Sequence, residues 1–239
     1  MIIMKPAKVG QNVIIEDNVT FSDGVIIGNN VIIYNGTHIG ERVIIQDNVV
    51  INKRPTRAKN SALQRSEDLV STVIGNDCIL GTSSIIYAGV VLEDEVFVAD
   101  LVSIREKVRV GAGTIVGRGV AIENECVIGK KCKLETNCYI TAYSILGDYV
   151  FIAPCVVTTN DNYLARTRER FEHFKGITVK NGGRIGANST ILPGRIIEED
   201  GTVGAGSVVT KDVRREELVL GSPARKIKDV PVNQLLRNQ

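Results

Sequence analysis

The sequence predicts an all-β fold, a parallel β-helix, from a six-residue repeat that runs through most of the chain. Every sixth residue is large and apolar from Val9 to Ile51, and the same spacing returns over Ile74 to Ile152 and Val179 to Val209. The fourth residue after each of these anchors is small or β-branched, and Gly, Asn and Asp fill many of the positions between. A period of six fits neither an amphipathic helix nor an alternating strand. It is typical of a hexapeptide β-helix, in which each hexad forms a short strand and a bend, and anchors of successive coils stack.

Composition and spacing predict how the repeat is divided along the chain. Of the 239 residues, 44% are hydrophobic but only 5% aromatic, and Trp is absent, which suits a narrow core filled by Ile, Val and Leu. We expect one continuous domain over residues 1–239. The repeat loses its phase at about 52–72 and again at about 159–178, which predicts two excursion loops, and a short tail is expected at about 222–239.

The charge balance and the chain ends exclude several kinds of partner. The formal net charge is only +2, so nothing favours binding to nucleic acid or to a membrane surface. The first residues lack an apolar signal core, and no apolar run approaches the length of a membrane span. We therefore expect a cytoplasmic protein.

Cysteine and histidine positions argue against a metal site. Four cysteines occupy the small position of the hexad, and we expect them to be buried: Cys78, Cys126, Cys132 and Cys138. No CxxC pair and no neighbouring histidine accompanies them, so no metal is expected. Cys155 lies outside this position and should be more exposed. His38 is interpreted as a surface turn residue.

Each interruption leaves two interpretations open. The first is basic, with residues Lys53, Arg54, Arg57, Lys59 and Arg65, which are either solvated or help to hold a diphosphate. The second combines polar and aromatic residues, from Asn160 to Phe174, on a rigid scaffold, where a ligand is expected. Alternatively, Phe171 and Phe174 fold this segment onto a neighbouring subunit.

Three phrases near the C-terminal end, IGANSTILPG, VGAGSVVTKDV and VLGSPARKI, resemble the acyl-CoA end of the hexapeptide acyltransferase superfamily. The resemblance implies coils that wind left-handed, a homotrimer and acetyl-CoA as cosubstrate. It also implies a pantetheine wall of small residues and a set of basic residues near the nucleotide phosphates. The wall would consist of Ala187, Ala205, Gly206 and Ser207, and the basic set of Lys211, Arg225 and Lys226.

The central phrase LETNCYITAYSILGDYVFIAPCVVTTNDNY resembles the N-acetyltransferases of nucleotide-linked amino sugars, of the UDP- or dTDP-3-amino-sugar type. The resemblance extends over about residues 74–231. It implies that Asn137 faces the sugar amine, although the same residue could be a structural corner asparagine. The expected site is a wall from Glu135 to Tyr143 facing a flap from Asn160 to His173. In that flap, Asn160, Asp161 and Tyr163 would line the sugar and nucleotide pocket, and Arg166 and Arg168 would contact the diphosphate.

The histidine count separates the possible mechanisms. Acetylation of a hydroxyl generally needs a histidine base, whereas a free amine attacks a thioester once it is positioned. Only His38 and His173 are present, which favours N-acetylation by direct attack. An O-acetyltransferase with His173 as base, and a non-catalytic β-helix binding module, remain as alternatives. The same count argues against a carbonic anhydrase of this fold, which would need three histidine ligands.

Overall fold

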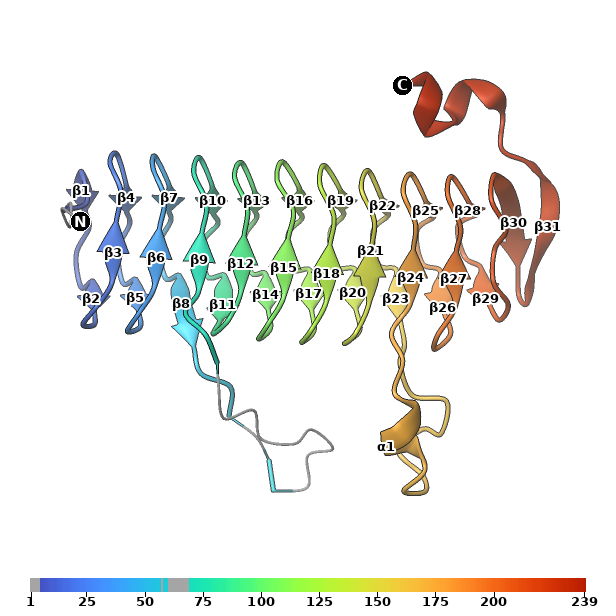
Figure 1. Ribbon diagram of the computed structural model, residues 1–239, viewed down its shortest axis with the longest axis horizontal. Coiled ribbons are helices and arrows are strands. Elements are labelled where there is room, and N and C mark those ends of the chain that lie inside the picture. The colour runs from blue at the N-terminus through green and yellow to red at the C-terminus, as the bar shows by residue number, and fades with distance from the viewer. Residues whose placement is uncertain (1–4, 57, 60–68) are drawn as a thin grey trace.

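A computed structural model describes residues 5–56, 58–59 and 69–239 of the chain. The described chain winds into an elongated β-solenoid, as the six-residue repeat predicts (Figure 1). Its strands stack into three long sheets, here called A, B and C, which are parallel except at the C-terminal end of sheet A. Each coil before that end contributes one strand to each sheet. Lys8 pairs with Ile26 and Ile26 with Ile44, so positions eighteen residues apart are neighbours and three hexads make one coil.

The strands are short because each hexad bends at its end. Sheet A contains β1 (Lys8–Val9), β4 (Ile26–Ile27), β7 (Ile44–Ile45), β10 (Ile79–Leu80), β13 (Phe97–Val98), β16 (Ile115–Val116), β19 (Lys133–Leu134), β22 (Phe151–Ile152), β25 (Arg184–Ile185), β28 (Thr202–Val203), β30 (Glu217–Gly221) and β31 (Ala224–Asp229). Sheet B contains β2 (Ile14–Ile15), β5 (Ile32–Ile33), β8 (Val50–Lys53), β11 (Ile85–Tyr87), β14 (Ser103–Ile104), β17 (Ala121–Ile122), β20 (Tyr139–Ile140), β23 (Val157–Thr158), β26 (Thr190–Ile191) and β29 (Val208–Val209). Sheet C contains β3 (Thr20–Phe21), β6 (His38–Ile39), β9 (Val73–Ile74), β12 (Val91–Leu92), β15 (Arg109–Val110), β18 (Val127–Ile128), β21 (Ile145–Leu146), β24 (Thr178–Val179) and β27 (Ile196–Ile197).

The predicted anchors form the core of the solenoid. From Ile27 to Val209 they are buried, because each lies between the anchors of the coils before and after it. Val9 and Ile15 are the exception, at 47% and 40% exposed. They belong to the first coil, which has a neighbour on one side only among the described residues.

The bends repeatedly require a left-handed backbone. One position in most hexads has a positive φ, and Asn and Gly often occupy it, as in Asn30 (55°) and Gly36 (80°). The predicted amine-facing residue Asn137 has φ 59° and stands at this same position. Bulky residues also adopt the conformation, among them Tyr143 at 66°. Such a φ is uncommon for a large side chain and is retained here by the coils on either side.

Both excursions leave the solenoid at the same corner. The bend between sheets A and B is called the A/B corner, and the bend between sheets B and C the B/C corner. The first excursion follows β8 and the second follows β23, so both begin at the B/C corner. Figure 1 shows the described residues of both excursions on the same side of the solenoid. Four coils lie between them, and at about 4.8 Å per strand their origins are roughly 24 Å apart.

The excursion bounds differ slightly from those predicted. Strand β8 continues through Lys53, so the first excursion begins two residues later than expected. Asn52 is 7% exposed, donates to the Asn35 carbonyl over 2.7 Å and accepts from Thr72 Oγ1 over 2.9 Å, which closes the base of the excursion. The predicted basic residues Arg57 and Arg65 lie outside the described residues. The second excursion covers residues 159–177 and contains a short helix, α1 (Arg170–His173).

The C-terminal segment is more ordered than the short tail predicted at about 222–239. Strand β31 pairs antiparallel with β30 and ends sheet A, while residues after Pro231 form two 3₁₀ turns, η1 (Val232–Gln234) and η2 (Leu236–Asn238). The turns are separated because Leu235 is extended and only 1% exposed. The Leu236 amide also donates to Asp200 Oδ1 over 2.9 Å, which holds the segment against the solenoid.

Candidate functional site

A pocket of about 240 Å³ lies at the B/C corner beside the second excursion. The coil between β17 and β18, the coil of β20 and β21, and the excursion itself each contribute to it. Its lining combines carboxylates, an arginine, amides and aromatic rings: Glu123, Asn124, Tyr139, Thr141, Ala142, Tyr143, Asn160, Asp161, Arg170 and Phe174. Convergent polar groups of this kind in a concave site are typical of ligand binding.

Glu123 provides the carboxylate on the coil side of the pocket. Burial raises its pKa above the ordinary value, the Arg105 charge acts to lower it and the Glu106 charge to raise it. The Arg105 Nη1 atom lies 3.7 Å from Glu123 Oε2. Burial, and next the Glu123 charge, also raise the pKa of Tyr139. A carboxylate with a raised pKa is suited to accept a proton in a reaction near neutral pH.

Next to Glu123, Asn124 brings an amide into the pocket. The residue is only 4% exposed. Its backbone carbonyl accepts a hydrogen bond, over 3.1 Å, from the backbone amide of Tyr143 in the next coil. Thr158 Oγ1 likewise accepts from the Thr141 amide over 2.8 Å. Hydrogen bonds between adjacent coils therefore fix the backbone at the floor of the pocket, and with it the positions from which the lining side chains extend.

Asp161 and Arg170 form the opposite wall at the root of the excursion. Asp161 accepts from the amides of Tyr163 and Ala165, over 2.8 and 3.0 Å, and lies 3.1 Å from Arg170 Nη2. Burial acts to raise the pKa of Asp161, but these amides and the Arg170 charge outweigh it and lower the pKa overall. The Arg170 guanidinium lies 5.2 Å from the Phe174 ring centroid, and its Nε is buried without a partner among the described residues.

Of the residues predicted for the acceptor site, the structure brings together three. Tyr143, Asn160 and Asp161 line the pocket. Tyr163 and His173 lie further out in the excursion, with ring centroids 6.0 Å apart. The Tyr163 hydroxyl donates to Glu169 Oε1 over 3.1 Å, and the same carboxylate oxygen lies 3.7 Å from His173 Nε2.

The remaining predicted acceptor residues lie outside the pocket. Arg166 and Arg168 are exposed on the excursion. Glu135 and Asn137 are at the A/B corner, at the other end of strand β20 from the pocket. Asn137 is exposed there, and its backbone amide donates to the Arg118 carbonyl over 2.9 Å. The expected wall from Glu135 to Tyr143 thus spans two different corners of the solenoid.

The small residues predicted for pantetheine share the A/B corner with Asn137. Ala187 lies between β25 and β26, and Ala205, Gly206 and Ser207 lie between β28 and β29. Ala205 and Gly206 are exposed. Ser207 is fully buried, with its hydroxyl bonded to the Gly204 carbonyl over 2.6 Å. Its side chain therefore serves the corner itself.

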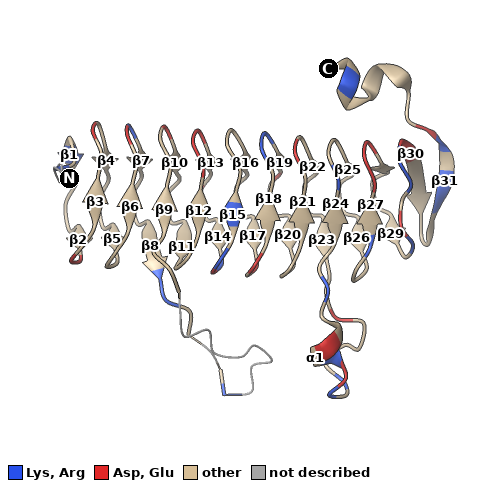
Figure 2. Ribbon diagram, viewed as in Figure 1, with Lys and Arg blue, Asp and Glu red and all other residues tan. Residues whose placement is uncertain are grey.

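The predicted phosphate-binding residues meet at the C-terminal end of the solenoid. Lys211, Arg225 and Lys226 line one hollow of about 310 Å³, together with Arg214. Figure 2 shows the basic residues along β31. Lys226 Nζ lies 2.7 Å from Asp229 Oδ1, so part of this charge is balanced within the strand.

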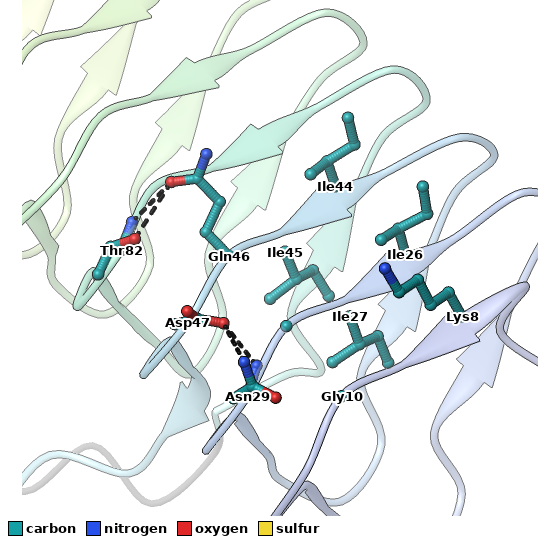
Figure 3. A pocket seen from close by; sticks show the side chains of 11 residues that line it. Lys8, Gly10, Ile26, Ile27, Asn29, Ile44, Ile45, Gln46, Asp47 and Thr82 are labelled. Atoms are coloured by element: carbon teal, nitrogen blue, oxygen red, sulfur yellow. Dashed lines mark hydrogen bonds between the residues drawn. The ribbon is translucent and has the colours of Figure 1, made fainter.

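A larger hollow, of about 480 Å³, lies on sheet A near the N-terminal end (Figure 3). The outward side chains Ile26 and Ile44 form much of it and are 39% and 37% exposed. Its carboxylate, Asp47, already accepts from the Asn29 amide over 2.6 Å. This hollow therefore offers little chemistry, and the smaller pocket at the B/C corner is the better candidate site.

Glu123 and Asn124 are pocket residues that the sequence analysis did not select, and Arg170 lies in the predicted flap but was given no role there. The sequence does carry a signal for the first of them, because Tyr87, Arg105, Glu123 and Thr141 are spaced by eighteen residues and therefore stack at one corner. Glu123 lies eighteen residues before Thr141, and both residues line the pocket. Arg170 carries no comparable signal, since its position depends on how the excursion folds.

The predictions for the cysteines and for His38 have mixed outcomes. Four cysteines are buried and Cys155 is exposed, as expected. His38 is exposed but lies in strand β6 and not in a turn, with its Nδ1 2.7 Å from Thr20 Oγ1. In the described part of the chain, no three His, Cys, Asp or Glu residues gather as they would around a metal ion. Over residues 5–56, 58–59 and 69–239, no helix is both long and apolar enough to cross a membrane.

A solenoid of hexads with a polar pocket at one corner defines this chain as a hexapeptide-repeat protein. Residues 6–39 match the family described as bacterial transferase hexapeptide (six repeats). Residues 71–99, 102–129 and 177–211 match the hexapeptide repeat of succinyl-transferase. Together these segments cover more than half of the chain, which belongs to the hexapeptide-repeat transferases.

Individual relatives match shorter stretches. The dTDP-3-amino-3,6-dideoxy-α-D-galactopyranose 3-N-acetyltransferase of Aneurinibacillus thermoaerophilus is 54% identical over 54 residues, 23% of this chain and 28% of that protein. The galactoside O-acetyltransferase of Escherichia coli K12 is 35% identical over 88 residues, 36% of this chain and 43% of that protein. The chain thus spans less than half the length of these curated relatives.

Among solved structures, the UDP-N-acetylglucosamine acyltransferase from Campylobacter jejuni aligns with a TM-score of 0.60 at 13% identity. The alignment covers 90% of this chain and 74% of that one. At this identity, the likeness concerns the fold alone.

Proposed function

We propose that the protein transfers the acetyl group of acetyl-CoA to the amino group of a nucleotide-linked amino sugar. The observation that carries this proposal is the half-buried Glu123 carboxylate, with its raised pKa, inside a pocket that no described histidine lines. A carboxylate both attracts an amine and accepts a proton from it. The 54% identity to an amino-sugar 3-N-acetyltransferase over a short stretch supports the same substrate class.

The pocket suggests how its residues would share the reaction. The neutral amine attacks the thioester carbonyl carbon, the C–N bond forms, and the C–S bond breaks as the CoA thiolate leaves. The nitrogen then loses one proton, and Glu123 receives it. Asn124 and Tyr143 orient the sugar, and Arg170 contacts an anionic or hydroxylated part of the acceptor.

The proposed site needs two protomers. The acceptor pocket is at the B/C corner, whereas the small residues suited to pantetheine, Ala205 and Gly206, are at the A/B corner. A cyclic homotrimer would bring the A/B corner of one protomer to the B/C corner of the next. The basic hollow of Lys211, Arg225 and Lys226 would then hold the nucleotide phosphates of CoA.

The test is a thiol-release assay with acetyl-CoA and a panel of UDP- and dTDP-linked 3-amino sugars. Replacement of Glu123 by Gln should lower kcat about 100-fold or more, because general-base groups contribute about 10²–10⁴-fold. Glu125 is the matched control, because it is exposed at the same bend and does not line the pocket. Equal activity of Glu123→Gln and Glu125→Gln would overturn the proposed role of Glu123, and release with no amino sugar would overturn the substrate class.

A second candidate is O-acetylation with His173 as base. The observation in its favour is the approach of Glu169 Oε1 to His173 Nε2 at 3.7 Å, which would orient the ring. Loss of turnover in His173→Ala with acetyl-CoA binding intact, together with release from a galactoside hydroxyl acceptor, would favour it. No shift of the thermal midpoint on adding acetyl-CoA would instead indicate a non-catalytic binding module.

A further inference from the structure

A chain of side-chain contacts runs along the B/C corner from the base of the first excursion to Glu123. Tyr87, Arg105 and Glu123 occupy equivalent positions in three successive coils. Tyr87 ends β11, Arg105 follows β14 and Glu123 follows β17, and these three strands pair in register. Each step is about 4.8 Å along the solenoid. Side chains at these positions can therefore touch, and the structure has them do so.

Three side chains contact the Arg105 guanidinium: Glu106, Glu123 and Tyr87. Its Nε and Nη2 donate to the two carboxylate oxygens of Glu106, over 2.9 and 3.2 Å. Its Nη1 lies 3.7 Å from Glu123 Oε2, and its guanidinium carbon lies 4.8 Å from the Tyr87 ring centroid. Glu106 is only 2% exposed, so the two-point contact with it is shielded from water. A planar guanidinium bound in this way has little freedom to turn.

Tyr87 is fixed in its turn by the base of the first excursion. The pairing of β8 with β11 shifts register at Tyr87, which places this residue opposite Lys53. Lys53 Nζ lies 5.3 Å from the Tyr87 ring centroid, and Thr72 Oγ1 donates to the Tyr87 carbonyl over 3.0 Å. Register shifts of this kind re-aim a side chain. Here the re-aimed ring becomes the support for Arg105.

We propose that Arg105 is a positioning residue, which Glu106 and Tyr87 hold in place so that it fixes the direction of the Glu123 carboxylate toward the acceptor amine. The inference rests on the proposed role of Glu123 as proton acceptor. Arg105 itself does not line the pocket, so it acts through Glu123. Without it, the carboxylate would be free to rotate away from the productive geometry.

Several charged or titratable groups face Glu123 from neighbouring elements and determine how its protonation responds. They are Arg105 and Glu106 on the coil before, Tyr139 on the coil after, Cys126 on its own coil, and Asp161 and Arg170 across the pocket. The Arg105 charge lowers the pKa of Glu123, and the Glu106 charge raises it. Removal of either charge should therefore shift the pH profile in opposite directions.

The experiment compares three variants in the thiol-release assay with dTDP-3-amino-3,6-dideoxygalactose over a range of pH. Arg105→Gln should lower kcat about 10-fold or more, leave the KM for acetyl-CoA unchanged, and move the acidic limb of the profile to higher pH. Glu106→Gln should move that limb to lower pH. Arg105→Lys keeps the charge but loses the planar contact, so kcat should fall while the limb stays near that of the unmodified protein.

A double variant controls for loss of folding, and two substitutions of Tyr87 test the support that its ring gives to Arg105. Because Arg105→Gln leaves Glu106 buried and unpaired, the double variant Arg105→Gln/Glu106→Gln serves if the single one does not fold. The acidic limb of the double variant should still move to higher pH, but by less than in Arg105→Gln. Tyr87→Phe keeps the ring and should retain kcat, whereas Tyr87→Leu should lower it.

The outcomes separate this inference from the proposed function. If Glu123→Gln is inactive while the Arg105 variants keep both kcat and the acidic limb, the positioning role is wrong and the proposed function stands. If Glu123→Gln is fully active, the proposed role of Glu123 fails first, and the positioning role of Arg105 fails with it. Equal loss of activity in folded Arg105→Gln and Arg105→Lys, with no shift of the limb in either or in Glu106→Gln, would indicate a merely structural residue and would overturn the inference.

Discussion

At the scale of single residues, the cysteines illustrate how the repeat controls chemistry. Burial raises the pKa of Cys78 and Cys132 to about 11, and that of Cys126 and Cys138 to about 12. These thiols are therefore protonated and enclosed near pH 8, whereas Cys155 is exposed. A thiol titration of the native protein at pH 8 should detect one fast-reacting cysteine, and the same titration in guanidinium should detect all five.

The control for the thiol titration is Cys155→Ser, which should abolish the fast reaction without changing the slow one. Four or five fast thiols in the native protein would contradict the burial of the hexad positions. Because the small position of the hexad faces the core, this outcome could be predicted from spacing alone.

Arg170 should matter more for the acceptor than the arginines selected from the sequence. Its guanidinium is tied to Asp161 and packed against Phe174 at the pocket wall, whereas Arg168 is exposed. Arg170→Ala should raise the KM for the amino sugar about 10-fold, equivalent to about 1.4 kcal/mol, with no change for acetyl-CoA. Arg168→Ala is the matched control. A larger effect at Arg168 would favour the prediction from sequence over the arrangement in the structure.

The ionised Glu123 carboxylate should lower the free energy of unfolding, by an amount that depends on pH. Its pKa in the folded state is raised, so the folded state binds the proton more tightly than the unfolded state does. The free energy of unfolding therefore falls as pH rises from the ordinary carboxyl pKa through the raised one. Urea unfolding should find Glu123→Gln more stable than the unmodified protein at pH 7–8, with the difference shrinking as pH is lowered. If the difference in unfolding free energy stayed the same as the pH was lowered from 8 to the ordinary carboxyl pKa, the raised pKa of Glu123 would be contradicted.

At the scale of elements, the second excursion depends on one close approach. A Cβ on Gly176 would clash with the backbone of Tyr143 and Ser144, because the segment that returns from the excursion to β24 passes directly against the B/C corner. Gly176→Ala should therefore push the excursion away from the pocket and cost about 1–3 kcal/mol of stability.

Kinetics and denaturation would test the role of Gly176. The KM for the amino sugar should rise in Gly176→Ala, and Glu172→Ala on the exposed surface of α1 should change neither quantity. An unaffected KM in Gly176→Ala would mean that the excursion does not shape the acceptor site.

The elements also explain which predictions could be made from the sequence. Anchors and turn residues determine where strands begin, so the solenoid and the position of both excursions follow from the spacing. The pocket residues were harder to predict, because the corner that a residue occupies depends on the sheet it follows and not on how close it lies in the sequence. Asn137 and Tyr143 are six residues apart but at different corners, whereas Glu123 and Tyr87 are thirty-six apart and share one. The folding of the excursion, and hence Arg170, depends on tertiary contacts that no local spacing encodes.

At the scale of the whole molecule, the two halves of the proposed site lie at different corners of the prism. Glu123 is at the B/C corner, and Ala205 is exposed at the A/B corner several coils further on. Rigid stacking of the coils prevents one corner from moving to the other within a protomer. An active assembly should therefore take each half from a different subunit, and sedimentation should find a trimer.

Subunit mixing tests this arrangement. Glu123→Gln removes the proton acceptor and Ala205→Trp blocks the pantetheine wall, so each variant alone should be inactive. In trimers formed from equal amounts of both, one interface in four joins an intact B/C corner to an intact A/B corner, and activity should return to about a quarter of that of the unmodified protein. Mixing the double variant with either single variant is the control and should restore nothing. Failure of the two single variants to complement, with mixed trimers verified by mass, would mean that each protomer contains a complete site.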